Sequence, residues 1–310
     1  MTSGYHALRQ GTAWMDVSER GRIVARGRDR ARLLHNLTSN EVKKLQPDEG
    51  CYAFLLSPQG RIQADLTLLC FEDRFLIDTE PELREKVQQH IRRYIIADQV
   101  ELADESAAMA AIAVEGPGAA AVLAAVGAPA PEAANSHLPW GEATVAAVSL
   151  TGQPGFRIYC AAEKKQEIEQ RLADAGAKQA NEADSRQVRI ENGRPRYGED
   201  IRETSLPQET QQMHAVSFNK GCYLGQEIVE RIRAQGHVNK KLVRVTIAGQ
   251  EPPAPGSKLT AQGAEAGEIT SAVYSPETGE IAALAYVRTN FAQPGTALEA
   301  GGTEARVSAG

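Results

Sequence analysis

An eight-residue run in the last third of the chain combines residue types that could support thiol chemistry. It reads Lys220-Gly221-Cys222-Tyr223-Leu224-Gly225-Gln226-Glu227. Its two glycines allow positive φ angles and the close approach of a second segment. A lysine two positions before Cys222 and a helix beginning near residue 228 would both favour the thiolate. The alternative is a small buried cysteine at a loop-to-helix corner, because free cysteines are among the most buried residues.

A second run gathers charges of both signs around two glycines and a proline, which predicts a loop rather than a long regular element. It reads Arg189-Ile190-Glu191-Asn192-Gly193-Arg194-Pro195-Arg196-Tyr197-Gly198-Glu199-Asp200. An ionised carboxylate such as Glu191 accepts two parallel hydrogen bonds, which suits the adjacent amino group and ring N–H of a pterin. The alternative is a solvated loop with surface ion pairs.

A third candidate, Asp65, lies on the second strand of a predicted β-hairpin. Two apolar runs, residues 53–56 and 61–71, flank a Ser57-Pro58-Gln59-Gly60 turn. Strand alternation places Asp65 on the less apolar face, where it must be solvated or paired, because burying an unpaired charge is prohibitive. The pattern alone leaves a surface aspartate and a ligand-binding aspartate equally open.

Composition bounds the remaining possibilities. A chain of 310 residues suggests two or three compact units. A net charge of −6 argues against direct nucleic-acid binding through a basic surface. The four cysteines show no zinc or cluster spacing, so no metal site is expected, and they suit a reducing cytoplasm. No apolar run approaches the about 18 residues that span a bilayer, and residues 1–10 lack the apolar core of a secretory signal.

The order of expected elements indicates an α+β fold followed by a small barrel. Helices are expected at 29–37, 82–94, 119–126 and 164–175, and strands at 95–102, 110–114, 144–150 and 155–160. From residue 237 onwards, short strands and Gly/Pro turns predict a closed barrel. We therefore expect domains at 1–236, with an internal break near 106–110, and at 237–310. The arginine-rich stretch 20–32 is interpreted as the solvated face of a strand-to-helix corner.

The run Lys-Gly-Cys-Tyr-x-Gly-Gln-Glu resembles the signature of the YgfZ family of folate-binding proteins, which are relatives of the aminomethyltransferase (T-protein) family of glycine cleavage. Residues 30–40, Arg-x-x-Leu-x-x-Asn-Leu-Thr-Ser-Asn, look like the opening segment of the same family, and the resemblance extends along nearly the whole chain. It implies two α+β subdomains and a C-terminal β-barrel around a central cavity, with tetrahydrofolate or a one-carbon derivative as cofactor.

The resemblance also assigns residues to a folate site. Glu191 matches a glutamate in an Arg-x-Glu-x-Gly run that binds the pterin, and Lys220 becomes the candidate for the anionic end or ring carbonyl of the folate. Arg196 and Tyr197 are candidates for the rim of the site. Asp65 matches an aspartate close to the reactive folate nitrogens, although that acid is not uniformly present in the YgfZ branch.

Two functions follow from the resemblance. The first is a tetrahydrofolate-binding protein that supports synthesis or repair of iron–sulfur clusters in client enzymes, tRNA-modifying ones included. Cys222 would then engage a partner, a cluster intermediate or a one-carbon adduct, in a cytoplasmic monomer with folate and iron–sulfur client or assembly proteins as partners. The second is a folate-dependent aminomethyl or methyl transferase in which Asp65 positions the reactive nitrogen. The Cys222 run favours the first because glycine-cleavage enzymes lack it, while the Glu191 run disfavours a plain interaction module.

Overall fold

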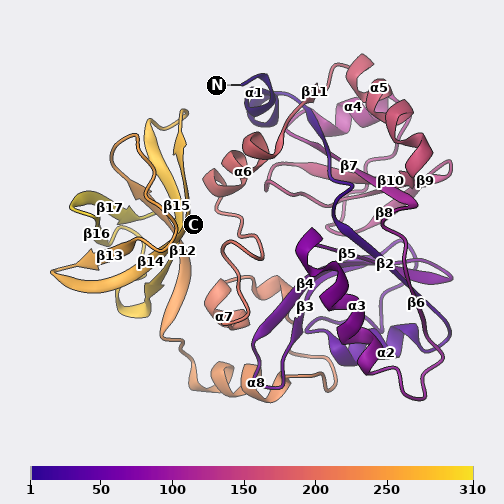
Figure 1. Cartoon of the computed structure of the whole chain (residues 1–310), viewed down its shortest axis with the longest axis horizontal. Coiled ribbons are helices and arrows are strands. Elements are labelled where there is room, and N and C mark those ends of the chain that lie inside the picture. Colours follow the sequence, from indigo (N-terminus) through magenta and orange to yellow (C-terminus); the bar gives the residue numbers. More distant parts are fainter. Residues whose placement is uncertain (1, 310) are drawn as a thin grey trace.

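The computed structural model describes residues 2–309 and contains three subdomains. Figure 1 shows two α+β units stacked on the right and a β-barrel on the left, with the segment that contains α6 (Glu182–Glu191) and α7 (Pro207–Thr210) between them. The sheets have five and six strands, and the barrel is closed. This confirms the expected fold class of two α+β subdomains and a C-terminal barrel.

The five-stranded sheet has the order β3-β4-β5-β2-β6 and contains the predicted hairpin. Its apolar face packs on α2 (Arg30–Leu37) and α3 (Arg84–Arg93). The strand expected over 95–102 is mostly irregular, and the observed strand begins at Glu101. The strands are β2 (Gly21–Arg26), β3 (Gly50–Leu56), β4 (Ile62–Cys70), β5 (Arg74–Thr79) and β6 (Glu101–Asp104).

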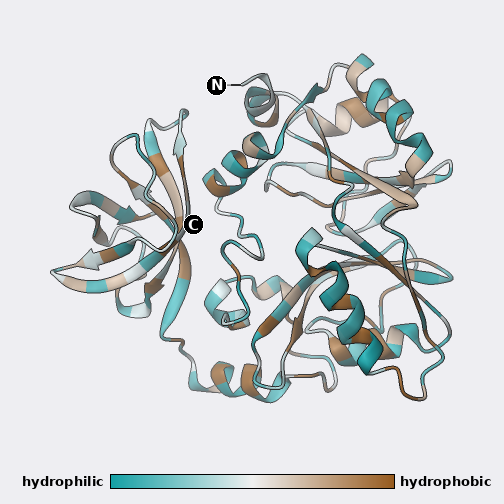
Figure 2. Ribbon diagram, in the orientation of Figure 1, coloured by the Kyte–Doolittle hydropathy of each residue, from teal (hydrophilic) through white to brown (hydrophobic). Residues whose placement is uncertain are grey.

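The six-stranded sheet has the order β11-β1-β7-β10-β9-β8. Because β1 and β2 belong to different sheets, the chain passes between the two units within its first 26 residues, and it passes back between β6 and β7. The strands are β1 (Ala13–Asp16), β7 (Met109–Glu115), β8 (His137–Trp140), β9 (Ala143–Ala146), β10 (Gly155–Ala161) and β11 (Lys178–Gln179). Its helices are α1 (Ser3–Gln10), α4 (Ala119–Ala125) and α5 (Lys165–Asp174). Figure 2 shows α3 and α5 hydrophilic over much of their length.

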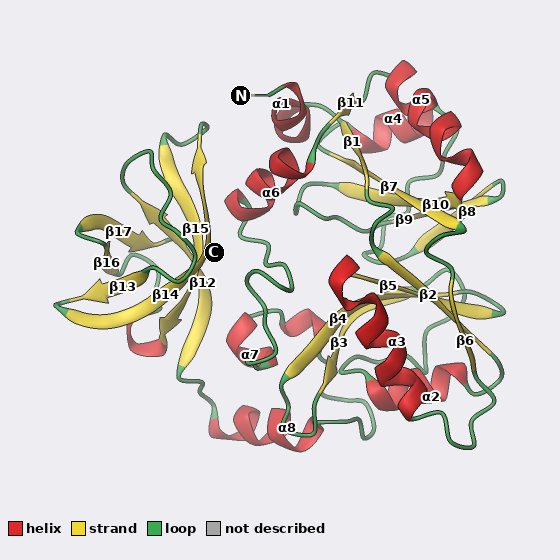
Figure 3. Ribbon diagram, in the orientation of Figure 1, coloured by secondary structure: helices red, strands yellow, loops and turns green. Residues whose placement is uncertain are grey.

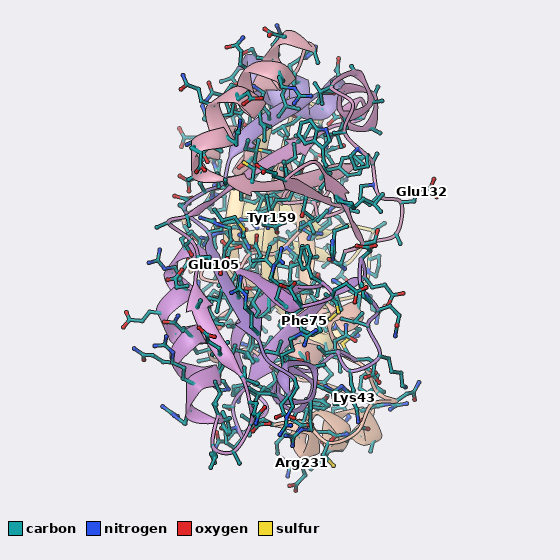
Figure 4. The ribbon with its side chains drawn as sticks, turned by 90° about the vertical axis from the view of Figure 1, so that its right-hand side faces the viewer. Lys43, Phe75, Glu105, Glu132, Tyr159 and Arg231 are labelled. Atoms are coloured by element: carbon teal, nitrogen blue, oxygen red, sulfur yellow. The ribbon has the colours of Figure 1, made fainter. Side chains whose placement is uncertain are left out.

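A buried carboxylate joins the two sheets. Asp78 on β5 accepts hydrogen bonds from Arg157 (2.8 Å) and from the hydroxyl of Tyr159 (2.7 Å), both on β10. Arg20 donates to the other oxygen at 2.7 Å. Burial opposes ionisation of Asp78, but the two guanidinium groups lower its pKa to about 2. In the side view of Figure 4, Tyr159 and Phe75 lie in the middle of the molecule, whereas Glu132 and Arg231 lie at its edges.

The buried guanidinium groups correct one interpretation of the sequence. Arg20 is 9% exposed and Arg22 is fully buried, so the arginine-rich stretch is not simply a solvated face. Arg22 donates to the backbone carbonyls of Ser18, Arg20 and Ser106. Arg20 and Arg22 therefore hold the turn between β1 and β2 against β5 and against the segment that joins β6 to β7.

The barrel has the strand order β12-β15-β14-β13-β16-β17 and encloses its own apolar core. It confirms the closed barrel that the sequence predicts from residue 237 onwards. Its strands are β12 (Lys240–Ile247), β13 (Lys258–Ala261), β14 (Ala264–Ser275), β15 (Glu280–Arg288), β16 (Ala297–Ala300) and β17 (Thr303–Val307).

Helices α6 (Glu182–Glu191), α7 (Pro207–Thr210) and α8 (Gln226–Gln235) connect the sheets to the barrel. Figure 3 shows the loop between α6 and α7 running between the barrel and the two α+β units. Buried Asp200 in this loop accepts 2.6 Å hydrogen bonds from the hydroxyls of Thr270 and Ser271 on β14. The same carboxylate accepts from Arg189 at 2.7 Å, so one side chain ties α6 to the barrel. No helix within residues 2–309 is long and apolar enough to cross a bilayer.

Candidate functional site

A cavity of about 680 Å³ lies where the two sheets meet α6 and the loop that follows it. Its wall includes side chains from β3, β4 and β10, from the turn before β2, and from residues 179–214. None of the described barrel residues, 240–309, belongs to this wall. The volume falls within the range of pockets that hold small-molecule ligands and cofactors.

Asp65 lies on the cavity wall and is 9% exposed. Its Oδ2 accepts a hydrogen bond from the hydroxyl of Tyr52 at 2.8 Å, whereas its buried Oδ1 has no partner among the described residues. Burial and the charge of Glu80 raise the pKa of Asp65 to about 6. Buried polar atoms without partners are rare in native proteins, so this carboxyl is suited to a hydrogen bond with a bound ligand.

Glu80 is another carboxylate of the wall; it directly follows β5, and its charge acts on Asp65. Arg20 forms an ion pair with one of its oxygens, and Arg196 lies 2.9 Å from the other. Burial opposes its ionisation, but these two guanidinium groups lower the pKa of Glu80. Asp65 and Glu80 thus form an asymmetric pair, in which Glu80 keeps its charge and Asp65 accepts a proton more readily.

An aromatic surface lies beside the acidic pair. The rings of Tyr52 and His214 stack with centroids 5.3 Å apart, and both residues line the cavity. Burial and the charge of Arg194 lower the pKa of His214. A neutral imidazole and a phenol provide a flat surface on which a planar heterocycle could stack.

Of the residues singled out from the sequence, Asp65 and Arg196 line this cavity and four do not. Arg196 is paired with Glu80 and Glu82. Tyr197 is 5% exposed and packs in the core of the five-stranded sheet. Glu191, Lys220 and Cys222 also lie outside the wall.

Glu191 is the last residue of α6, so the predicted loop is helical over its first three residues. A capping box formed by Asn181 and Asp184 begins this helix, and the Asn-x-x-Asp spacing is a sequence signal that could have predicted it. Both carboxylate oxygens of Glu191 accept from the hydroxyl of Tyr5, at 3.0 and 3.1 Å, and Arg9 lies 3.7 Å away. This carboxylate already has protein partners.

Lys220 is buried, and its ammonium donates to three backbone carbonyls, those of His35 (2.5 Å), Thr38 (2.6 Å) and Asn40 (2.7 Å). These groups belong to the end of α2 and the turn after it, where helix carbonyls lack intrahelical partners. Burial lowers the pKa of Lys220 to about 8. The three donors of the ammonium are all used within the protein, which gives Lys220 a capping role.

The rest of the eight-residue run is packed in the same way. The N–H of Leu224 donates to the carbonyl of Asn36, and the ring of Tyr223 is buried. Gly225 has φ +82°, and a Cβ there would lie 2.5 Å from the carbonyl oxygen of Ser57 in the hairpin turn. Cys222 is exposed, whereas Cys51, Cys70 and Cys160 are buried. The run therefore holds an accessible thiol on a loop fixed against α2 and the β3–β4 turn.

Sequence reasoning missed Tyr52, Glu80, Arg157 and Arg194 as cavity residues. Tyr52 alternates with buried residues on β3, so period-2 patterning could have placed it on the same face as Asp65 of the paired strand. Metal-binding side chains form no cluster of three or more in the part of the chain that the structure describes.

Comparison with known proteins identifies the class of this fold. The GCVT N-terminal domain matches residues 1–220, and the glycine cleavage T-protein C-terminal barrel domain matches residues 240–309. The crystal structure of the glycine cleavage system aminomethyltransferase T from Bartonella henselae superposes with a TM-score of 0.90, covering 99% of this chain and 87% of that one at 21% identity. This similarity establishes the fold.

Sequence relatives carry the identification further. An aminomethyltransferase from Rubrobacter xylanophilus is 30% identical over 292 residues, covering 91% of this chain and 78% of the relative. One from Nostoc sp. is 28% identical over 316 residues, covering 96% and 83%. The chain therefore belongs to the aminomethyltransferase (glycine cleavage T-protein) family.

Proposed function

We propose that this protein binds tetrahydrofolate, or a one-carbon derivative of it, in the cavity between the two sheets. The observation that carries the proposal is the carboxyl of Asp65, which lies on the cavity wall with one buried oxygen unpaired. A reduced folate brings ring and bridge N–H groups that could supply the missing donor. Membership of the aminomethyltransferase family supports the same ligand class.

Within this proposal, Asp65 contacts the nitrogens of the folate, and Tyr52 and His214 provide stacking surface. Bound tetrahydrofolate would supply a nitrogen that accepts or donates a one-carbon unit. Arg196 acts through Glu80, whose charge it stabilises together with Arg20. Glu191 holds the end of α6 against Tyr5, so its effect on the ligand would be indirect.

The eight-residue run around Cys222 suggests what folate binding is for. We propose that folate binding serves synthesis or repair of iron–sulfur clusters in client enzymes, tRNA-modifying ones included, in a cytoplasmic monomer. The exposed thiol of Cys222 supports a role toward a protein partner. Since Cys222 lies outside the cavity wall, its partner would dock on the outer surface near α2 and α8.

A second candidate is a folate-dependent aminomethyl or methyl transferase. The family supports it, and so does Asp65, whose raised pKa lets it exchange a proton near neutral pH. Formation of methylene-tetrahydrofolate or formaldehyde from an aminomethyl donor would distinguish this enzyme from a binding protein.

Both candidate functions require tetrahydrofolate to bind in the cavity, and calorimetry with tetrahydrofolate under reducing conditions tests this binding. The intact protein should bind, and Asp65→Asn should weaken binding about 10- to 100-fold, the effect of losing one hydrogen bond to a charged group. Asp73→Asn, in the exposed turn between β4 and β5, is the matched control and should bind normally. Absence of binding by the intact protein would refute the proposal.

The role of Cys222 needs a separate measurement in cells. Cys222→Ser should leave tetrahydrofolate affinity unchanged and lower the activity of an iron–sulfur client enzyme. Buried Cys160→Ser is a control for cysteine content. Full client activity with Cys222→Ser would remove the iron–sulfur role of this residue without affecting the folate proposal.

A further inference from the structure

The cavity wall carries six arginines, and five of them already have acidic partners within 4 Å. Asp78 pairs with Arg20 and Arg157, Glu199 with Arg186 and Arg189, and Glu80 with Arg196. Arg194 is the sixth. Its guanidinium has no hydrogen bond or ion pair to any group within residues 2–309.

The position of Arg194 is fixed although its side chain is unpaired. Its backbone N–H donates to the carbonyl of Arg189 at 2.9 Å, and its own carbonyl accepts from the guanidinium of Arg189 at 2.7 Å. Arg189 is in turn held by Glu199 and Asp200. The loop between α6 and α7, seen in the middle of Figure 3, therefore presents Arg194 from a rigid base.

Arg194 is half-buried, and no carboxylate oxygen within residues 2–309 lies within 4 Å of its guanidinium. Its charge affects the pKa of Tyr52 and of His214, so it lies within electrostatic reach of the aromatic surface of the cavity. His214 has a lowered pKa and is neutral at pH 7. Partly burying a cation without an anion is unfavourable, and a guanidinium binds carboxylates through two parallel N–H groups.

We propose that Arg194 forms a carboxylate-binding subsite of the cavity, beside the aromatic surface of Tyr52 and His214. The inference rests on the proposed function, because the cavity's ligand brings the carboxylate. Two sources share this chemistry. The carboxylate belongs either to the glutamate tail of tetrahydrofolate or to a separate small carboxylate, such as an amino acid, that binds together with the folate. Arg194 takes the anion-binding role that the sequence suggested for Lys220.

The test compares tetrahydrofolate with 6-methyltetrahydropterin, which has the same reduced ring system and no carboxylate. Both are titrated into the intact protein, into Arg194→Gln and into Arg186→Gln. Arg186 also lines the cavity, but its charge is neutralised by Glu199. When Arg186 is replaced, Glu199 still has Arg189 as an ion-pair partner. Since the Arg194 side chain makes no internal bonds, Arg194→Gln should unfold at the same temperature as the intact protein.

If the folate tail occupies the subsite, Arg194→Gln should lower tetrahydrofolate affinity about 10- to 100-fold and leave the pterin unaffected. If a separate carboxylate occupies it, folate affinity stays constant, and glycine or N-methylglycine titrated into the folate complex loses affinity on Arg194→Gln. Equal affinities of both proteins for all these ligands would overturn the subsite alone. Failure of the intact protein to bind either pterin compound would overturn the proposed function and the subsite together.

Discussion

The hydroxyl of Tyr52 donates a 2.8 Å hydrogen bond to Oδ2 of Asp65, and Oδ1 of the same carboxyl is buried without a partner among residues 2–309. The two residues lie on adjacent strands of the hairpin β3–β4, and both line the cavity. Because of this hydrogen bond, the pKa of Asp65 depends on the presence of the Tyr52 hydroxyl.

Replacing Tyr52 should move the titration of Asp65. Burial and the charge of Glu80 raise the pKa of Asp65 to about 6, and the hydrogen bond from Tyr52 opposes this rise. Tyr52→Phe should therefore raise the pKa further, which ¹³C NMR of the aspartate carboxyl carbons measures. Tyr94→Phe, at the end of α3 and outside the cavity wall, should leave the titration where it is. An Asp65 midpoint that falls or stays constant in Tyr52→Phe would contradict this account.

Asp65 should also make stability depend on pH. Its pKa is higher in the folded protein than the ordinary 3.8, so the folded state binds more protons than the unfolded state between pH 4 and 6. The contribution of Asp65 to the free energy of unfolding therefore decreases as pH rises through this window. Asp65→Asn removes the free-energy cost of ionising this buried carboxyl in the folded protein, which is up to about 3 kcal/mol at pH 7.

Urea unfolding at pH 4 and pH 7 measures this effect. Asp65→Asn should be more stable than the intact protein at pH 7, and the difference should nearly vanish at pH 4. The same substitution should weaken tetrahydrofolate binding, because residues that bind a ligand often lower the stability of the folded protein. A variant that is less stable than the intact protein at both pH values would show that Asp65 has a structural role instead.

The buried ion pairs of Asp78 predict the opposite dependence of stability on pH from that of Asp65. The pKa of Asp78 is lowered to about 2, so its stabilising contribution is present above pH 4 and is lost as pH falls from about 4 towards 2. Asp78→Asn should cost about 3–5 kcal/mol, because Arg20 and Arg157 would keep buried charges without a full partner. Chemical unfolding at pH 7 tests this, with Asp73→Asn as the exposed control. A loss below about 1 kcal/mol would mean that the two sheets do not depend on this carboxylate.

The sequence predicted those parts of the structure that depend on local patterns. The β3–β4 hairpin follows from two apolar runs around a Pro/Gly turn, and the barrel follows from short strands between such turns. Asp65 could be placed on the polar face of β4 because strand alternation is strict.

The partners of charged side chains could not be predicted, because they are distant in sequence. Arg20 pairs with residues 58 and 60 positions away, so its stretch was mistaken for a solvated face. The ammonium of Lys220 reaches carbonyls more than 180 positions earlier. The family resemblance suggested a folate contact for Lys220, and in the fold its ammonium donates to three backbone carbonyls.

Replacing Lys220 tests whether this residue stabilises the fold or contacts the folate. Lys220→Met keeps the unbranched chain as far as the position of Cε but leaves the carbonyls of His35 and Thr38 without their donor, which should cost about 3 kcal/mol of unfolding free energy. Lys43→Met, an exposed lysine after the same helix, is the control and should be neutral.

Ligand affinity completes this test, because Lys220 lies outside the cavity wall. Calorimetry well below the unfolding temperature should give the same tetrahydrofolate affinity for Lys220→Met as for the intact protein. Loss of affinity at unchanged stability would instead make Lys220 a folate contact, as the sequence suggested. The expected combination, lower stability with unchanged affinity, would assign the lysine of the Cys222 run to holding its loop against α2.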